Sequence, residues 1–130
     1  MSGASRLVVG LEGTSLATAE RAFLAGRRPL GVVLLPRNLT SAPQAAALVD
    51  EVRSACDPAP LLYVDQEGGA VDRIGPLLGL PFPSAASLAQ KGVDRVHECA
   101  YLMGRAARRL GFDVDFAPCL DLAQPGTGAV

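Results

Sequence analysis

An aspartate and an arginine flank a double glycine in the middle of the chain, directly after an apolar run. The run Leu61–Val64 leads into Asp65, and Arg73 follows eight residues later, with Gly68 and Gly69 between them. A carboxylate at the end of a buried strand is costly unless something binds it. Paired glycines let the backbone turn sharply and approach a ligand closely. Because a carboxylate accepts hydrogen bonds and a guanidinium donates them, the pair suits the hydroxyl groups of a sugar.

The same two side chains also allow a purely structural interpretation. In this alternative Asp65 and Arg73 pair with each other and only pin the loop between them. The spacing does not decide between a ligand-binding pair and a loop-pinning pair, so both remain open at this point.

Polar residues also follow two other apolar runs. Arg37 and Asn38 come after one of them and Asp121 comes after another. We expect these three side chains to cap or shape loops rather than to contact a ligand. His97 is the only histidine and lies within a predicted helix, so we expect it to have no catalytic role. The sequence predicts neither a metal site nor a cofactor.

Acid–base catalysis often uses two carboxylates, and the chain offers two pairs at a spacing of two residues. They are Asp65 with Glu67 and Asp113 with Asp115. Neither pair clearly flanks a cleft in the predicted arrangement. Asp113 comes just after a predicted helix and Asp115 alternates within a predicted strand, which favours structural roles. We therefore name no catalytic residue in this chain.

Short apolar runs alternate with segments of helical spacing. Four runs are typical of parallel strands buried on both faces, at 7–11, 31–35, 61–64 and 114–117. Three segments predict helices, at about 16–24, 41–55 and 93–110. The glycines and prolines of 75–84 predict a loop. This order predicts a parallel α/β sheet, and the pattern leaves an open doubly wound sheet and a (β/α)8 barrel as alternatives.

The same patterns predict part of the core. We expect Leu34, Val64 and Phe116 to be buried on the strands. The third helix carries an apolar stripe that should face the sheet, made of Val96, Ala100, Met103, Ala107 and Leu110.

The composition describes one folded domain with little net charge. Of 130 residues, 49 % are hydrophobic and 19 % charged, and 12 basic side chains nearly balance 13 acidic ones. These values argue against disorder and against a basic surface for nucleic acid. No apolar stretch is long enough to span a bilayer and the N-terminus lacks a secretory pattern, so we expect a cytoplasmic protein. Cys56, Cys99 and Cys119 predict reduced, mostly buried thiols.

Four segments in a fixed order resemble glycoside hydrolases of family 3. The string VDQEGG at 64–69, with Val71 and Arg73, resembles that family's VDQEGGxVxR signature. The segments 31–38, 80–85 and 111–121 are similar to its second strand with an Arg-Asn turn, its Pro-rich loop and its fourth strand. The resemblance covers nearly the whole chain, and its spelling is most similar to the bacterial β-N-acetylhexosaminidase branch.

The resemblance implies a fold and an activity. The fold is a (β/α)8 TIM barrel, of which residues 1–130 are a partial N-terminal domain, truncated at its C-terminus, with about four strands. The activity is retaining hydrolysis of terminal β-linked N-acetylglucosamine, in this branch from peptidoglycan fragments during cell-wall recycling. Asp65 and Arg73 match residues that hold the sugar's hydroxyls. The family's nucleophile, an Asp on a late strand, and its His–Asp acid/base pair have no counterpart in these residues, so the chain alone is expected to be inactive.

The signature loop departs from the family's usual GGRVQR spelling. Ala70 stands where an arginine is common and Asp72 where a glutamine is common, which changes the local charge. Two other functions remain as alternatives: a family 3 β-glucosidase and a truncated, non-catalytic sugar-binding protein. We expect a carbohydrate ligand, no nucleic-acid or membrane partner, and self-association through the exposed half-barrel.

Overall fold

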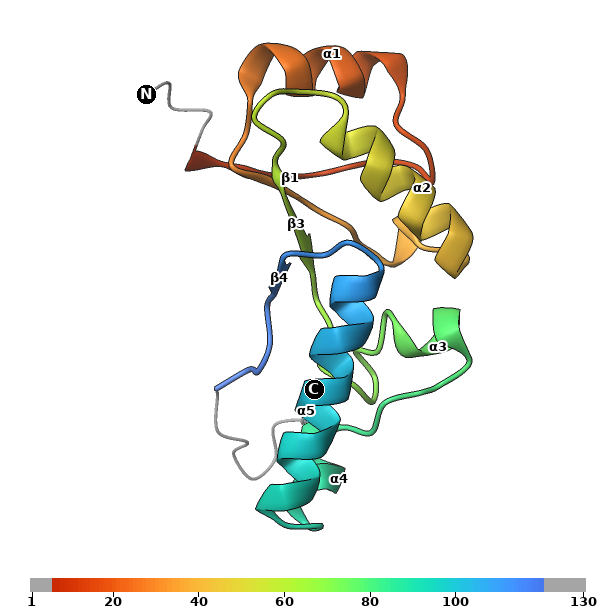
Figure 1. Cartoon of the computed structure of the whole chain (residues 1–130), viewed down its shortest axis with the longest axis vertical. Coiled ribbons are helices and arrows are strands. Elements are labelled where there is room, and N and C mark those ends of the chain that lie inside the picture. Colours follow the sequence, from red (N-terminus) through yellow and green to blue (C-terminus); the bar gives the residue numbers. More distant parts are fainter. Residues whose placement is uncertain (1–5, 121–130) are drawn as a thin grey trace, which may run out of the picture.

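The computed structural model describes residues 6–120 and contains one parallel sheet of four strands (Figure 1). The strands lie side by side in chain order and are β1 Val8–Gly10, β2 Gly31–Val33, β3 Leu61–Val64 and β4 Val114–Asp115. In the register, Val9 lies beside Val32 and Val32 beside Leu62. Three of the strands are shorter than the apolar runs that predict them, but the predicted parallel α/β sheet is confirmed.

Three long helices connect each strand to the next, and they are α1 Thr18–Arg27, α2 Ala42–Arg53 and α5 Val93–Arg109. At the start of α1 the Glu20 carboxylate accepts hydrogen bonds from the backbone N–H groups of Glu12 and Ala17, at 2.9 Å each. At the start of α2 the Ser41 hydroxyl accepts from Gln44 N at 3.3 Å. The Ser41 hydroxyl and the Glu20 bond to Ala17 N satisfy N–H groups at the helix starts that have no partner within the helix, and the bond to Glu12 N ties the loop after β1 to α1.

The connection from β3 to α5 is long and contains two short helices, α3 Gly75–Leu78 and α4 Ala85–Ala89. A 3-10 turn, η2 Pro36–Asn38, follows β2. The sequence predicts a loop for 75–84, so α3 corrects that prediction. Its turn forms because Pro76 fits the start of a helix and Gly79 ends it with a left-handed φ of 66°.

One face of the sheet packs against the helices and forms the core. The strand residues on this face alternate along β2 and β3, and Val32, Leu34, Leu62 and Val64 are fully buried. The matching helix residues come mainly from α2 and are Ala45, Leu48, Val49 and Val52. Burying each large side chain stabilises the fold by about 1.5–3 kcal/mol. The predicted burial of Leu34 and Val64 is confirmed.

The opposite face of the sheet is largely open within residues 6–120. Leu61 is 40 % exposed and Phe116 is 53 % exposed, although the Phe116 ring stacks on Tyr63 with centroids 5.2 Å apart. The prediction of a buried Phe116 is therefore wrong for this part of the chain. Burial on both faces holds only in the middle of the sheet, where Gly31 and Tyr63 on this face are buried. The apolar runs do not say which of the two faces receives a covering layer.

The N-terminal half of α5 extends beyond the sheet and lies beside α4 (Figure 1). For this reason Met103, Ala107 and Leu110 of its predicted stripe are buried, while Val96 and Ala100 are exposed. Within residues 6–120 no helix has the length and apolar character needed to cross a bilayer.

The cysteines are less buried than the sequence predicts. Cys56 and Cys99 are half-buried and Cys119 is exposed, and no disulfide joins the three, all of which lie in the described part of the chain. Burial raises the pKa of the Cys56 and Cys99 thiols, which keeps them protonated and weakly reactive at neutral pH. The prediction of reduced thiols holds, whereas that of mostly buried thiols is wrong.

Candidate functional site

Asp65 is the first residue after β3 and leaves the carboxyl end of the sheet. By the alternation of a strand it follows Leu61 and Tyr63 toward the open face. The side chain is half-buried, and its carboxylate makes no hydrogen bond or ion pair with any residue in the range 6–120. The hydrogen-bonding capacity of Asp65 is therefore unused by the described part of the protein.

Arg73 lies at the far end of the same loop and is also half-buried. Its side-chain Nε–H is buried without a hydrogen-bond partner among the described residues. No ion pair joins Arg73 to Asp65 in residues 6–120, where the salt bridges involve other arginines. The structure therefore does not contain the loop-pinning pair that the sequence left open. A buried donor without a partner is unfavourable and is expected where a ligand supplies the acceptor.

The loop is held instead by Gln66 and Asp72, which sequence reasoning did not assign to the site. Gln66 is fully buried, and its Nε2 donates to Asp72 Oδ1 at 2.8 Å. Gln66 Oε1 accepts from the backbone N–H groups of Arg73 and Ile74, at 2.8 and 2.7 Å. The spacing of Asp72 three residues before Gly75, at the start of a turn, is a sequence signal that points to capping by Asp72. Gln66 belongs to the VDQEGG string, but neither its charge nor its spacing indicates a role for it.

The double glycine is required by a close backbone approach. Gly68 and Gly69 have φ of 82° and 61°, in the left-handed region, and Gly69 N donates to Phe82 O at 2.9 Å. A Cβ atom on Gly69 would lie 2.6 Å from Ser84 Cβ, and one on Gly68 would collide with the Pro83 carbonyl. The pair thus lets the signature loop pack directly against the segment before α4.

Asp115 closes the site from the end of β4. Its Oδ1 accepts a hydrogen bond from Gln66 N at 2.9 Å. Burial raises the pKa of Asp115, the Gln66 hydrogen bond acts against that rise, and the nearby charges of Asp65 and Glu67 add to it. Asp115 is thus the group that joins β4 to the loop, in agreement with the structural role that the sequence predicts.

The strand end after β2 is built by loop-shaping residues, as the sequence predicts. Asn38 is fully buried, donates from Nδ2 to Leu11 O and Gly13 O at 3.2 and 2.7 Å, and accepts from Leu35 N at 2.9 Å. Arg37 Nε donates to Leu11 O at 2.8 Å. The third residue of this group, Asp121, lies outside the described residues.

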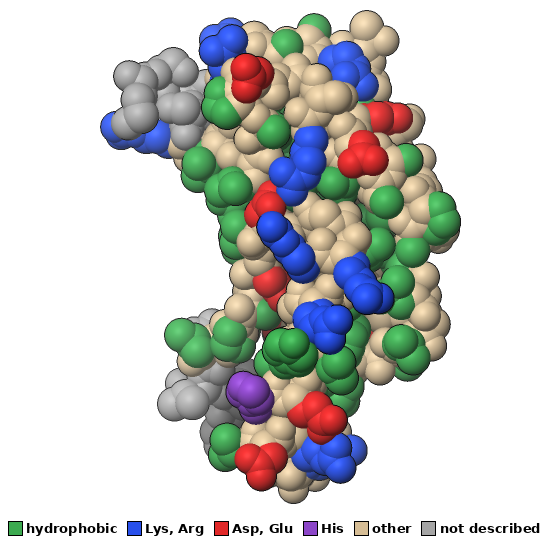
Figure 2. Space-filling model, in the orientation of Figure 1, with side chains coloured by type: hydrophobic (Ala, Val, Ile, Leu, Met, Phe, Trp, Pro, Cys, Tyr) green, Lys and Arg blue, Asp and Glu red, His purple; other side chains and the backbone are tan. Residues whose placement is uncertain are grey.

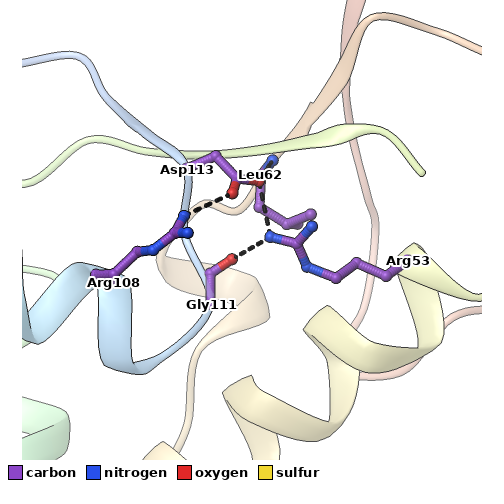
Figure 3. Close-up of polar contacts among 5 residues, drawn as sticks. All are labelled: Arg53, Leu62, Arg108, Gly111 and Asp113. Carbon is purple, nitrogen blue, oxygen red and sulfur yellow. Dashed lines mark hydrogen bonds and ion pairs between the residues drawn. The ribbon is translucent and has the colours of Figure 1, made fainter. Parts of the chain in front are cut away.

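Asp113 lies just before β4 and connects three elements at the opposite, amino end of the strands (Figure 3). Its Oδ2 accepts from Arg53 of α2 at 2.7 Å and from Leu62 N of β3 at 2.9 Å, and its Oδ1 accepts from Arg108 of α5 at 3.2 Å. Burial acts to raise the pKa of Asp113, but the Leu62 and Arg53 hydrogen bonds and the charges of Arg53 and Arg108 bring it below its usual value. Asp113 is therefore a structural carboxylate.

The remaining polar groups of α5 face solvent. His97 is exposed, and no group of three or more potential metal ligands exists within residues 6–120. Arg105, Arg108 and Arg109 are also exposed, and basic side chains gather on the visible face around the C-terminal half of α5 (Figure 2).

Two hollows on the surface of residues 6–120 differ in their distance from the signature loop. A groove of about 1120 Å³ runs between α5 and the segment 78–83, and it contains neither Asp65 nor Arg73. A smaller hollow of about 270 Å³ is lined by the signature loop, including Glu67 and Gly68, and by the start of α4. We place the candidate site at the strand ends, because the unpartnered polar groups lie there and size alone does not select a binding site.

Residues 8–128 match the glycosyl hydrolase family 3 N-terminal domain. The chain therefore belongs to this family. It is similar to a β-hexosaminidase of Alkalilimnicola ehrlichii, with 37 % identity over 124 residues that cover 91 % of this chain and 36 % of that protein. The chain spans 36–38 % of the length of the β-hexosaminidases compared.

Solved structures of the family share the fold. Native NagZ from Neisseria gonorrhoeae is 26 % identical, with a TM-score of 0.78 over 91 % of this chain and 37 % of that one. A family 3 β-N-acetylglucosaminidase from a Paenibacillus species is 26 % identical, with a TM-score of 0.81 over 92 % and 23 %. With the four parallel strands in chain order, this likeness confirms the N-terminal half of a (β/α)8 barrel.

Proposed function

We propose that this chain is the sugar-binding, N-terminal part of a retaining glycoside hydrolase that removes terminal β-linked N-acetylglucosamine. One observation carries the proposal. At the carboxyl end of β3, Asp65 and the buried Nε–H of Arg73 have no partner within residues 6–120, although both flank a loop that is otherwise tightly hydrogen-bonded. In a (β/α)8 barrel this end of the strands carries the active site.

The two groups complement a sugar chemically. The Asp65 carboxylate accepts hydrogen bonds from hydroxyl groups, and the Arg73 guanidinium donates to hydroxyl oxygens from a rigid, planar group. Hydrogen bonds to charged groups contribute about 1.5–3 kcal/mol each. Both side chains then act in binding the sugar rather than in breaking the glycosidic bond.

The names of the relatives support an N-acetylglucosaminide over a glucoside. The relatives compared are β-hexosaminidases, and one of the solved structures is a β-N-acetylglucosaminidase. This favours the proposal over the alternative of a β-glucosidase. No comparable observation favours a non-catalytic sugar-binding protein.

We assign no nucleophile or acid among residues 6–120. Retaining enzymes need two carboxyl groups about 5–5.5 Å apart across the glycosidic bond. Asp113 lies in the Arg53–Arg108 cluster, Asp72 holds the loop and Asp115 binds Gln66 N, so none of these three is placed for that role. The proposal therefore places the catalytic pair outside the described residues and treats 1–130 as part of a larger barrel domain.

The proposal extends to the cellular compartment of the enzyme and to its natural substrate. By resemblance to the bacterial branch, we extend it to a cytoplasmic enzyme that acts on peptidoglycan fragments. The half-barrel alone exposes Leu61 and Phe116 on one face, which supports self-association of the 130-residue chain.

Substrate choice tests the proposal. The protein, produced at the full length that its gene encodes, is assayed with 4-nitrophenyl β-N-acetylglucosaminide and 4-nitrophenyl β-glucoside. We expect at least a tenfold higher kcat/KM for the first, and proton NMR should show the β-anomer as the first product. A preference for the glucoside, or no turnover of either compound, contradicts the proposal.

A further inference from the structure

Gln66 makes three side-chain hydrogen bonds within the signature loop. It is fully buried, and both ends of its amide are engaged. The Nε2 group donates to Asp72 at 2.8 Å, and the Oε1 atom accepts from the backbone N–H groups of Arg73 and Ile74. The backbone of Arg73 is therefore held at its own N–H and at the next one along the chain.

Asp72 extends this network to the other side of the loop. Its Oδ1 also accepts from Gly75 N at 2.9 Å, and its Oδ2 accepts from Phe82 N at 2.7 Å. A Cβ atom on Gly75 would collide with the Asp72 carboxylate, so the glycine makes this approach possible. One carboxylate thus joins Gln66, the start of α3 and the segment before α4.

We propose that Gln66 and Asp72 form a clamp that positions Arg73 for its ligand. They are positioning residues, because neither is proposed to touch the ligand. The assignment of the ligand as a sugar rests on the proposed function, whereas the clamp itself rests on the contacts above. It fixes the Arg73 backbone while leaving the buried Nε–H unpartnered, which is the arrangement that a preorganised binding group requires.

The clamp has a defined polarity that makes it testable. Gln66 supplies the donor and Asp72 the acceptor in the bond that joins them. Gln66→Glu replaces the donor by a second carboxylate and places two acceptors in contact. Asp72→Asn in the same protein supplies a donor again, so the double variant restores a bond of reversed direction. It keeps the acceptor for Arg73 N and Ile74 N. The Asn oxygen takes the place of Oδ2 and still accepts from Phe82 N, whereas Gly75 N loses its acceptor.

The experiment measures kcat/KM on the β-N-acetylglucosaminide and hydrogen exchange at the Arg73, Ile74 and Phe82 amides, in the protein at its full encoded length. Gln66→Glu should lower kcat/KM by about tenfold or more and speed exchange at these amides. The double variant should recover at least half of the loss on a logarithmic scale. A double variant no better than Gln66→Glu overturns the clamp.

A second comparison separates positioning of Arg73 from a general loss of stability. In an Arg73→Ala background, Gln66→Glu should change kcat/KM by less than about threefold, because the group that it positions is gone. Gln44→Met is the matched control, since the Gln44 side chain makes four hydrogen bonds where that of Gln66 makes three, but to Thr14, Asn38 and Thr40 in the loops after β1 and β2. It should lower the thermal midpoint while kcat/KM changes by less than threefold. Equal effects of Gln66→Glu with and without Arg73 overturn the inference.

The outcomes also separate the clamp from the proposed function. If the unaltered protein turns over no N-acetylglucosaminide, the proposed function fails and the exchange data alone decide. In that case faster exchange at Arg73 and Ile74 in Gln66→Glu, reversed in the double variant, supports the clamp. Unchanged exchange overturns it.

Discussion

Arg73→Ala should weaken binding of the transition state while leaving the free energy of unfolding nearly unchanged. The Arg73 Nε–H is buried and has no partner within residues 6–120, so Arg73→Ala removes no hydrogen bond or ion pair in this range, and only the packing of a half-buried side chain is lost. A hydrogen bond from this group to a ligand would contribute about 1.5–3 kcal/mol. At 1.36 kcal/mol for each factor of ten, kcat/KM should fall by about 10- to 150-fold. The kcat/KM of Asp65→Asn should fall by a similar factor, because the Asp65 carboxylate likewise makes no hydrogen bond or ion pair within residues 6–120.

The assay combines kinetics with unfolding of the protein at its full encoded length. The kinetics use 4-nitrophenyl β-N-acetylglucosaminide, and the free energy of urea unfolding should change by less than about 1 kcal/mol, because no hydrogen bond or ion pair within residues 6–120 is lost. Arg73→Lys is the control, since it keeps the charge but lacks the Nε–H and the planar fork. It should recover little activity.

Three results would refute this reasoning. Unchanged kinetics in both variants would remove Asp65 and Arg73 from the binding site. A loss of more than about 1 kcal/mol of unfolding free energy would show that these side chains hold the loop after all. Rescue of Asp65→Ala by azide would show that Asp65 is a nucleophile, because the anion replaces a missing catalytic carboxylate.

Three further predictions concern the rest of the chain. Asp113→Asn should lower the unfolding free energy by about 2 kcal/mol at neutral pH. Because the folded-state pKa of Asp113 is lowered, this loss of stability should be complete above about pH 4 and should vanish as the pH falls through the lowered pKa. Urea titrations of both proteins at several pH values check this. Gly69→Ala should destabilise the protein more than Gly79→Ala, since both have a left-handed φ but only Gly69 lies against Ser84; equal thermal midpoints would contradict the close-approach argument. The 130-residue chain alone should not hydrolyse the N-acetylglucosaminide, and turnover above a boiled sample that a substitution within the chain abolishes would contradict this.

The sequence predicted the order and type of the long elements because their periodicities are distinct. Buried strands give continuous apolar runs and α2 gives an amphipathic stripe, so both stand out. Phe116 shows where this reasoning ends. Its run is apolar, but whether both sheet faces are covered depends on contacts with other parts of a fold, which a local pattern does not contain.

The candidate site was only partly predictable for a related reason. Asp65 and Arg73 could be selected because their charges are unusual after a buried strand. The role of Gln66 could not be predicted, because a neutral amide usually lies on the surface, and three side-chain contacts of Gln66 form only when residues 72–74 fold back over it. The ion pair between Asp65 and Arg73 that spacing allowed is replaced by contacts between their neighbours.

Asp113 and Asp115 lie two residues apart yet at opposite ends of β4, and this has a consequence for protein engineering. Asp113 ties α2, β3 and α5 together near the start of the strands, whereas Asp115 faces the loop at their finish. A library of variants that changes residues at the carboxyl end of the strands, in order to alter selectivity, can therefore leave Asp113 unchanged. The stability that its hydrogen bonds contribute is then kept in every variant. Such a library keeps both carboxylates, because Asp115 accepts the hydrogen bond from Gln66 N that joins β4 to the loop.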